Sequence, residues 1–443
     1  MNMSPQNNSI QAYRLLVVAF LLFIAGAVVV GAASPADSSS DQAPPINDST
    51  SATGATDPAS VTSPQQYTIT ATSVAAMNQS ELRRYGTVGT QADRRVELTM
   101  PPSNVSAVEE LPWVTDVRPA LHPAPSNIPG GSDGESLGVE RLHEQGVTGG
   151  GIKVGIIDNG FEESAIDGTI QASVSFRNTP GDPAHGTGVA EAVTRTAPDT
   201  QLYLASAETG VDHQKAIEYL VDQNVDVIVY TISWPAIAPD GDHFLTESIS
   251  SARQQGTLFI TSAGNYAETH WEGEFRDADD DARLEWDRSG DEQNALPAQD
   301  ANFDGGRLNV YIRWKETGAP SNYRAALYNP DTEQYVAVGD GERTNTGSNR
   351  FTRLGTSVRS QPLALVVENT AGPADDEIEI VVTDGPSKIE QNIPSSSLGA
   401  PADVPAAVTV GAYQRGAYAQ QSGIASYSSR GPTEDGRIGV DVT

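Results

Sequence analysis

The sequence predicts an α/β protein built on a doubly wound parallel sheet, with an inserted antiparallel β-sandwich and a small α+β unit before it. From residue 136 to 265, short apolar runs rich in β-branched residues alternate with helical segments, as in a parallel sheet covered on both faces. From 270 to about 392 the chain is polar and alternating, with Gly, Asn, Asp and Pro turns. Because residues 407–412 resume the buried-strand pattern, the β-rich part is predicted to be an insertion.

The elements of the α/β part are predicted from the period of the apolar residues. Strands are expected at 152–158, 202–205, 225–232, 257–262 and 407–412, and helices at 137–145, 185–195, 212–223 and 244–255. Inside the insertion, alternation predicts strands at 308–314, 324–328, 363–368 and 377–383. Together these elements define a domain over 136–443 with an insertion at about 270–392.

A smaller unit is predicted before this domain, over residues 66–121. Alternating strands are expected at 67–71, 95–100 and 114–118, and a capped helix at 103–111. Residues 122–135 are rich in Pro, Gly, Ser and Asn, which is typical of an exposed, cleavable linker. A small unit ahead of an enzyme domain favours a propeptide, and an unrelated surface module is the alternative.

The N-terminal residues predict export. Arg14 precedes an almost unbroken apolar run over 15–33, which ends in Gly-Ala-Ala. This pattern is that of a signal peptide, and the run is also long enough for a retained membrane anchor. Residues 34–65, rich in Ser, Thr and Asp, predict a disordered linker. The protein is therefore expected to be secreted or on the cell surface, with membrane contact only through the anchor.

Composition excludes several classes of function. The chain has 27 basic and 58 acidic residues, a net charge of −31, and only four lysines. Such a surface repels nucleic acid and anionic lipid, because phosphate contacts need clustered Lys and Arg. It suits a halophilic source, where salt screens the self-repulsion, and an ordinary acidic secreted protein is the alternative. With no cysteine, disulfides, zinc–thiolate sites and cysteine nucleophiles are excluded.

Three short motifs carry candidate catalytic groups. Asp158 begins Asp-Asn-Gly after a predicted strand, His185 begins His-Gly-Thr-Gly at a predicted helix start, and Asn265 ends Ser-Ala-Gly-Asn after another strand. Each motif alone also fits a turn or a cap. In combination, a histidine can act as base, an aspartate can hold its tautomer, and an amide can stabilise an oxyanion.

These motifs, with Thr-Ile-Ser-Trp at 231–234 and Ser-Tyr-Ser-Ser-Arg-Gly-Pro-Thr at 426–433, resemble the subtilisin-like serine proteases, or subtilases. The resemblance implies a subtilisin-like fold and Ser-His-Asp acyl transfer on polypeptide substrates, with no required cofactor. It makes Asp158 the triad acid, His185 the general base and Asn265 the oxyanion-hole amide. The substrate-binding residues that it implies are Thr231, Ser233 and Trp234. The unit over 66–121 corresponds to the family's propeptide, an intramolecular inhibitor and chaperone.

One departure concerns the nucleophile. In the family it lies in a Gly-Thr-Ser-x-Ala-x-Pro motif after the 426–433 segment, and no such motif precedes Thr443. Gly355-Thr356-Ser357 lies in the insertion, lacks the following Ala and Pro, and is interpreted as a solvated turn. The chain is therefore expected to be C-terminally incomplete and inactive as a peptidase, since loss of the serine in subtilisin itself lowers turnover about 10⁶-fold.

Other functions remain open beside the protease. The main alternative is a non-catalytic extracellular pseudoprotease that binds proteins or peptides. A nucleotide-binding protein is disfavoured, because the glycines at 149–151 precede the strand and no Walker motif exists. Asp277, Asp279 and Asp281 have the alternating spacing of calcium loops but lack the turn glycine. Calcium is thus a candidate ligand there, and an acidic, solvated turn is the alternative.

Overall fold

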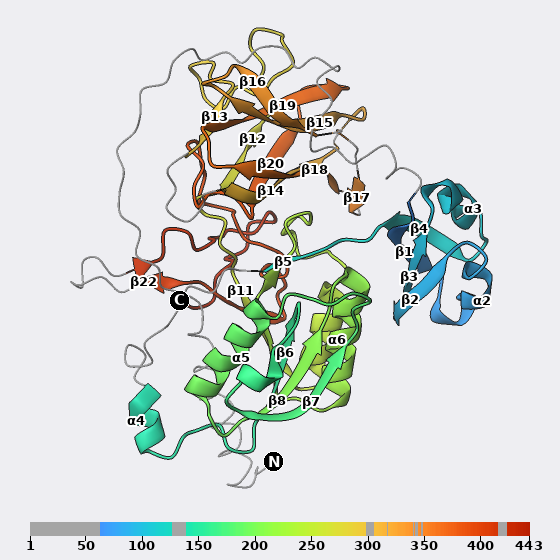
Figure 1. The fold of residues 1–443 in the computed structure, drawn as a ribbon, viewed down its shortest axis with the longest axis vertical. Coiled ribbons are helices and arrows are strands. Elements are labelled where there is room, and N and C mark those ends of the chain that lie inside the picture. Colours follow the sequence, from blue (N-terminus) through green and yellow to red (C-terminus); the bar gives the residue numbers. More distant parts are fainter. Residues whose placement is uncertain are drawn as a thin grey trace.

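The computed structural model describes residues 63–125, 139–297, 305–316, 318–339, 341, 344–346, 349–414 and 423–443. Its three parts are an N-terminal unit at one side, an α/β unit below and the insertion above (Figure 1). The predicted signal peptide or anchor, nearly all of the 34–65 linker and most of the 122–135 linker lie outside the described residues. Within the described ranges, no helix combines the length and apolarity needed to cross a membrane.

The α/β unit is built on six parallel strands in the order β21-β11-β9-β6-β8-β7. The strands are β6 (Lys153–Asp158), β7 (Thr169–Ser175), β8 (Gln201–Ser206), β9 (Val227–Tyr230), β11 (Leu258–Ser262) and β21 (Ala407–Val410). The predicted parallel α/β sheet is confirmed. The strand predicted over 225–232 is divided, because β9 ends at Tyr230 and a short strand, β10 (Ile232–Ser233), follows it.

Helices cover both faces of this sheet. They are α5 (Ala184–Thr196), α6 (Gly210–Asp222) and α7 (Thr246–Gln254), and the unit also contains α4 (Val139–Glu144) and a 3₁₀ turn at Glu163–Ala165. Helices α6 and α7 pack with Ile157 and Ile228 in one apolar cluster. Helix α5 packs with the intervening strand residues Ile156 and Val229 in another. Because strand side chains alternate between faces, neighbouring residues of one strand fill two separate cores.

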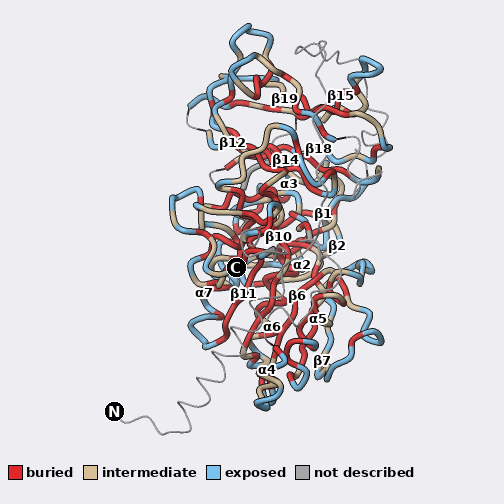
Figure 2. Tube along the Cα trace, turned by 90° about the vertical axis from the view of Figure 1, so that its left-hand side faces the viewer, coloured by how far each residue is buried: buried red, intermediate tan, exposed pale blue. Residues whose placement is uncertain are grey.

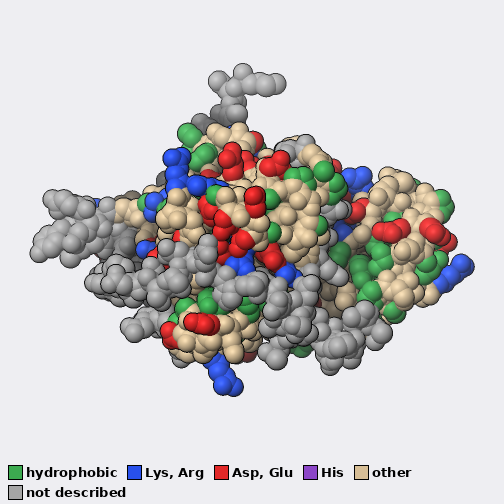
Figure 3. Space-filling view, turned by 90° about the horizontal axis from the view of Figure 1, so that it is seen from above, with side chains coloured by type: hydrophobic (Ala, Val, Ile, Leu, Met, Phe, Trp, Pro, Cys, Tyr) green, Lys and Arg blue, Asp and Glu red, His purple; other side chains and the backbone are tan. Residues whose placement is uncertain are grey.

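The insertion consists of two antiparallel sheets that share one apolar core. The first has the order β12-β20-β14-β18-β17 and the second β13-β19-β15-β16. Their bounds are β12 (His270–Glu274), β13 (Asn294–Leu296), β14 (Gly305–Lys315), β15 (Asn322–Asn329), β16 (Gln334–Val338), β17 (Thr344–Thr346), β18 (Asn349–Arg359), β19 (Leu363–Ala371) and β20 (Glu377–Thr383). Buried chain runs through both sheets and on into the α/β unit (Figure 2). Seen from above, acidic side chains gather on the outer surface, in keeping with the net charge of −31 (Figure 3).

One expectation for the insertion is wrong. Gly355-Thr356-Ser357 is not a turn, because it lies inside β18 and pairs with Asn309, Leu308 and Arg307 of β14. Ser357 is exposed on this strand. The small polar residues of Gly355-Thr356-Ser357 are compatible with a strand as well as with a turn. The pairing with β14 determines that they form a strand.

The N-terminal unit is a four-stranded antiparallel sheet, β2-β3-β1-β4, with two short helices. Its elements are β1 (Gln65–Ala71), α2 (Gln79–Leu82), β2 (Thr87–Ala92), β3 (Arg95–Met100), α3 (Val105–Glu109) and β4 (Val114–Pro119), with 3₁₀ turns at Val74–Ala76 and Pro102–Asn104. Apolar residues such as Ile69 and Leu98 form its own core. Strands β2 and β3 contact helix α6, so this unit docks on the α/β unit. Two further short pairs are β5 (Ala124–Pro125) with β10, and β22 (Tyr413–Gln414) with β23 (Gly423–Ile424).

A buried ionic cluster joins the insertion to the α/β unit. Arg313 of β14 donates to the backbone oxygen of Ile237 and to the carboxylate of Glu379. His270 also contacts Glu379, at 3.1 Å from Nε2 to Oε1, and its Nδ1 lies 2.6 Å from the backbone oxygen of Ile393. Burial alone would raise the pKa of Glu379, but the cations Arg313 and His270 hold it below its usual range.

Replacement of Arg313 by alanine is expected to destabilise the protein by about 3 kcal/mol, the lower end for a broken buried pair, because it leaves the Glu379 carboxylate, 17% exposed, without its main cation. Urea denaturation measures this loss. Arg359→Ala serves as the matched control, since Arg359 is an exposed arginine on the neighbouring strand β18. Equal midpoints for the two variants would contradict the assigned role of Arg313.

Candidate active site

Asp158 and His185 form a hydrogen-bonded pair at the carboxyl end of the sheet. Asp158 is the last residue of β6 and is fully buried, and His185 lies in the first turn of α5. His185 Nδ1 is 2.7 Å from Asp158 Oδ2, and the backbone N–H of Asn159 donates to Oδ1 at 2.8 Å. An ionised Asp158 accepts the Nδ1 proton, and the lone pair of a neutral His185 then lies on Nε2.

The close approach of α5 to the end of β6 requires a glycine at position 186. A Cβ atom there would lie 2.3 Å from the Gly160 backbone oxygen and 2.8 Å from Asp158 Cβ. The helix start is held further by Thr187, whose hydroxyl donates to the Pro183 oxygen and accepts from the Glu162 N–H. The His-Gly-Thr motif at the start of α5 therefore packs directly against the Asp-Asn-Gly motif at the end of β6.

Asn265 lies on the loop that follows β11. Gly264 in this loop has φ = +104°, a left-handed conformation that glycine adopts without a Cβ penalty. Ser429 holds the loop from both sides, because its N–H donates to the Gly264 oxygen and its hydroxyl accepts from the Tyr266 N–H, each at 2.9 Å. From the sequence, Ser429 was placed only in the 426–433 segment that resembles the family's, and this contact was not predicted.

The sheet order brings the predicted site residues to one edge. Strands β11, β9 and β6 are neighbours and parallel, so their carboxyl ends carry Asn265, Thr231 and Asp158 side by side. Ser233 pairs through its backbone in β10. The side chain of Trp234, in contrast, is core: it is 1% exposed, and its indole N–H donates to the Tyr230 hydroxyl.

Residues 121–125, here called the strap, occupy the edge of β10. Ala124 pairs with Ser233 and Pro125 with Ile232, in antiparallel register. Leu121 and Ala124 are buried, so the expectation of an exposed linker from residue 122 is wrong at Ala124. The only sequence signal was Pro-Ala-Pro at 123–125, which favours extended backbone but indicates no partner.

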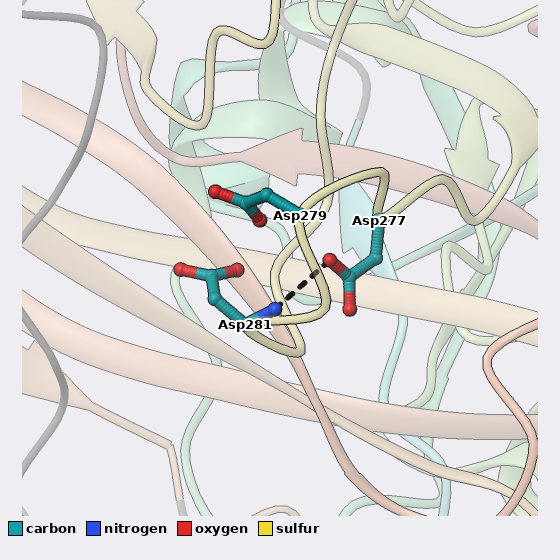
Figure 4. A group of neighbouring side chains, drawn as sticks. All are labelled: Asp277, Asp279 and Asp281. Atoms are coloured by element: carbon teal, nitrogen blue, oxygen red, sulfur yellow. Dashed lines mark hydrogen bonds between the residues drawn. The ribbon is translucent and has the colours of Figure 1, made fainter.

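Asp277, Asp279 and Asp281 lie together on the loop between β12 and β13. Their carboxylates approach within 4.8 Å of one another (Figure 4). Asp277 accepts the backbone N–H of Asp281 at 3.1 Å and of Ala282 at 2.8 Å. Asp281 Oδ2 lies 3.3 Å from Arg283 Nη1. These contacts within the protein favour the acidic-turn interpretation, and calcium stays a prediction.

Millimolar calcium is expected to change the melting temperature no more than the same concentration of magnesium. The reason is that protein donors already hold this turn in place. Differential scanning calorimetry measures both shifts. A calcium-specific rise that disappears in Asp279→Ala would instead assign a calcium site to these three residues.

Comparison with known proteins identifies the α/β segment. Residues 149–303 match the Subtilase family. Subtilisin DY of Bacillus licheniformis is 30% identical over 146 residues, which cover 28% of this chain and 52% of that protein. Subtilisin of Bacillus pumilus is 28% identical over 144 residues, which cover 28% of this chain and 51% of that protein. The chain thus spans about half the length of these curated relatives.

Among solved structures, the CspB protease of Clostridium perfringens aligns over 69% of this chain and 77% of that chain, with 14% identity and a TM-score of 0.43. The family assignment rests on the sequence match. The matched segment contains the Asp158, His185 and Asn265 motifs. The sheet order brings the ends of β6 and β11 to one edge, and His185 of α5 is hydrogen-bonded to Asp158 there. Over residues 149–303, the chain is thus similar to the subtilase family.

Proposed function

We propose that the protein is an exported serine endopeptidase in which Asp158 and His185 are two members of the catalytic triad. The observation that carries this proposal is the 2.7 Å contact between His185 Nδ1 and the buried Asp158 carboxylate. A buried aspartate on Nδ1 is the arrangement that makes histidine a general base towards a nucleophilic hydroxyl. The similarity of residues 149–303 to the subtilase family supports the same reaction.

In this mechanism His185 Nε2 takes the proton from a serine hydroxyl as the oxygen attacks the peptide carbonyl. Asp158 keeps the ring in the correct tautomer and stabilises the imidazolium that forms. The amide of Asn265 donates to the oxyanion, from the loop that Ser429 holds. His185 then returns the proton to the leaving amine. The family resemblance assigns the serine to a Gly-Thr-Ser segment after residues 426–433.

The N-terminal unit is proposed to inhibit the enzyme as a propeptide. The strap pairs with β10 as an extended substrate would, so it blocks the edge implied to bind substrate. The unit also buries its β2–β3 face against helix α6, which supports a chaperone role for that contact. Polypeptides are the proposed substrates. The apolar run at 15–33 supports export. The acidic composition supports a medium of high salt concentration.

The test is hydrolysis of a fluorogenic peptide by a form of the protein that carries the family's Gly-Thr-Ser segment after Thr443. The form with serine is expected to cleave the peptide, and the matched form with alanine in its place is not. A folded serine form that binds peptides without cleaving them would contradict the protease and favour the pseudoprotease alternative. In that case the strap would mark a peptide-binding site only.

A further inference from the structure

The outer face of strands β14 and β18 carries two exposed arginines. Side chains of these strands alternate between the core of the insertion, where Val310 packs, and this outer face. The antiparallel register sets Tyr311 opposite Arg353 and Arg307 opposite Ser357. Arg307 and Arg353 are both exposed, and they share one face because positions 307 and 311 differ by an even number of residues. The two cations therefore project from the insertion on the same side.

The Arg353 guanidinium is fixed in place by its neighbours. Asn309 Oδ1 accepts from Arg353 Nη2 and also from Nε, at 3.1 Å. The guanidinium carbon lies 5.7 Å from the centre of the Tyr311 ring, within the range of a cation–π contact. Asn309 is buried and donates from Nδ2 to Asp384 Oδ2 at 2.6 Å, so its amide turns its oxygen towards Arg353. A side chain held in this way loses little further entropy when it binds a ligand.

The absence of a side chain at Gly355 makes room for the guanidinium. A Cβ atom at this position would lie 2.9 Å from Arg353 Nη2 and 2.9 Å from Asn309 Oδ1, closer than real Cβ atoms approach such groups. A larger residue would therefore displace the guanidinium from Asn309. Ser357 is the next residue of β18 on the same face, so small side chains of β18 lie between Arg353 and the place where Arg307 projects.

Arg353 keeps unused hydrogen-bond donors. A guanidinium has five N–H groups, and the bonds to Asn309 occupy one on Nε and one on Nη2. The edge formed by Nη1 and the second N–H of Nη2 remains. Among the described residues, no carboxylate pairs with Arg353 or Arg307, although the chain has 58 acidic residues against 27 basic ones. Three other arginines of the insertion each pair with a glutamate: Arg313, Arg324 and Arg350.

We propose that Arg353 and Arg307 bind the carboxylates of an acidic polypeptide. Their surface, formed by Arg307, Asn309, Arg353 and Gly355, is here called the arginine face. Two donors on one edge of a guanidinium match the two oxygens of a carboxylate, and Nη1 and Nη2 of Arg353 present such an edge. The net charge of −31 repels the long phosphate arrays of nucleic acid, so a short acidic stretch of polypeptide is the ligand. That this polypeptide is a substrate rests on the proposed function, whereas the binding of carboxylates does not.

The arginine face borders the strap. Burial lowers the pKa of the His122 imidazole, the Glu208 carboxylate opposes this effect, and the nearby cation of Arg353 lowers the pKa further. A polypeptide that passes His122 can therefore reach Arg353 with an acidic residue. Such a second contact raises the affinity of the whole polypeptide without any change in its other contacts. The insertion would in this way favour substrates that carry acidic residues.

The test is the binding of a fluorescein-labelled peptide, Gly-Asp-Asp-Gly-Asp-Asp-Gly, to the full chain, measured by fluorescence anisotropy. In about 1 M NaCl the Debye length is about 3 Å, so the long-range repulsion by the acidic surface is screened while contacts at hydrogen-bond distance persist. The matched peptide with asparagine for every aspartate is expected to bind about tenfold or more weakly, because it cannot form charge-assisted hydrogen bonds with the arginines.

Variants of the arginine face distinguish a defined site from general attraction. Arg353→Gln and Arg307→Gln are each expected to weaken binding of the acidic peptide about tenfold. Arg353→Lys and Gly355→Ala keep every charge, yet both are expected to weaken binding several-fold, because the first lacks the planar fork and the second displaces it. Arg359→Gln is the matched control, since Arg359 is exposed on β18 at roughly 20 Å from Arg353 along the strand. Near-ultraviolet circular dichroism checks that each variant is folded.

Three results would overturn the inference. The first is equal binding of the aspartate and asparagine peptides. The second is an equal loss of affinity in folded Arg353→Gln and Arg359→Gln, which would indicate a diffuse effect of charge. The third is complete displacement of the peptide by millimolar inorganic phosphate, which would assign the site to a free anion. Binding requires no nucleophile, so these outcomes are separate from the hydrolysis test. An arginine face that binds the acidic peptide in a protein without peptidase activity would contradict only the protease.

Discussion

Replacement of His185 by alanine is expected to lower peptide turnover about 10⁶-fold in the form that carries the serine segment. In subtilisin itself, loss of the triad histidine alone has an effect of this size, and loss of the aspartate alone about 10⁴-fold. A millionfold change corresponds to about 8 kcal/mol of transition-state stabilisation. The large value follows because a serine hydroxyl is a poor nucleophile unless a base takes its proton during attack.

Asp158→Asn is expected to cause a smaller loss of turnover than His185→Ala. Asparagine keeps the shape of the buried side chain but replaces the carboxylate that accepts from His185 Nδ1 at 2.7 Å, so turnover is expected to fall about 10⁴-fold. His143→Ala is the control, since His143 lies on α4 and contacts the backbone oxygen of Thr196. Steady-state kinetics measure the turnover of all three variants. Turnover by His185→Ala within tenfold of the parent form would show that His185 is not the general base.

Docking of the N-terminal unit is expected to weaken as the pH rises from about 4.5 to about 8. Glu97 of β3 is 1% exposed, and Asp212 of helix α6 is fully buried. Neither Glu97 Oε1 nor Asp212 Oδ1 has a hydrogen-bond partner among the described residues. Burial, and then the nearby Asp212 carboxylate, raise the pKa of Glu97 to about 8, and burial also raises that of Asp212.

The sign of this pH dependence follows from the raised pKa of Glu97. A raised pKa means that the docked state holds the proton more tightly than the undocked state, in which Glu97 regains water. The contribution of Glu97 to the free energy of docking is therefore fully present below the ordinary glutamate pKa of 4.5. It decreases by about 1.4 kcal/mol for each pH unit between 4.5 and about 8. Of the other charged groups here, Glu208 adds repulsion and itself faces Arg177, at 3.6 Å.

Glu97→Gln tests this prediction, because glutamine is neutral at every pH in the window. Urea denaturation at pH 5 and pH 8 is expected to show a loss of several kcal/mol in the wild type that is absent from Glu97→Gln. Glu109→Gln, an exposed position on α3, is the matched control. The same pH dependence in the wild type and in Glu97→Gln would show that another group titrates at the interface.

Local pattern was sufficient to predict the main sheet and to single out Asp158 and His185, which lie in contact. The runs that became β6, β9 and β11 are continuous and apolar, so burial on both faces is visible in the sequence itself. Strand β7 was not predicted, although its half-buried residues Ile170, Ala172 and Val174 alternate with exposed polar residues, because a short edge strand lacks the continuous apolar run of the central strands. Strand β2 likewise contains Gly89 and few apolar residues.

Contacts between distant residues were beyond that reasoning. The strap at 121–125 has the composition of a linker, and its pairing with Ser233 depends on a partner more than a hundred residues away. The contact of Ser429 with the Asn265 loop depends in the same way on a separation of 163 residues. The motifs led to the prediction of roles for Asp158, His185 and Asn265, whereas the groups that hold these residues in place became visible only in three dimensions.

The separation between Tyr266 and Ser429 also has a consequence for the order in which the molecule matures. The chain leaves the α/β sheet after β11, builds the whole insertion, and returns with β21 to complete the same sheet. During synthesis, the loop that bears Asn265 is made long before Ser429, which holds that loop by hydrogen bonds. Contacts of such high sequence separation form late in folding. A nascent protein would thus already have its Asp158–His185 contact while the Asn265 loop still lacked the two contacts from Ser429, so the proposed oxyanion site would form only after the insertion had folded.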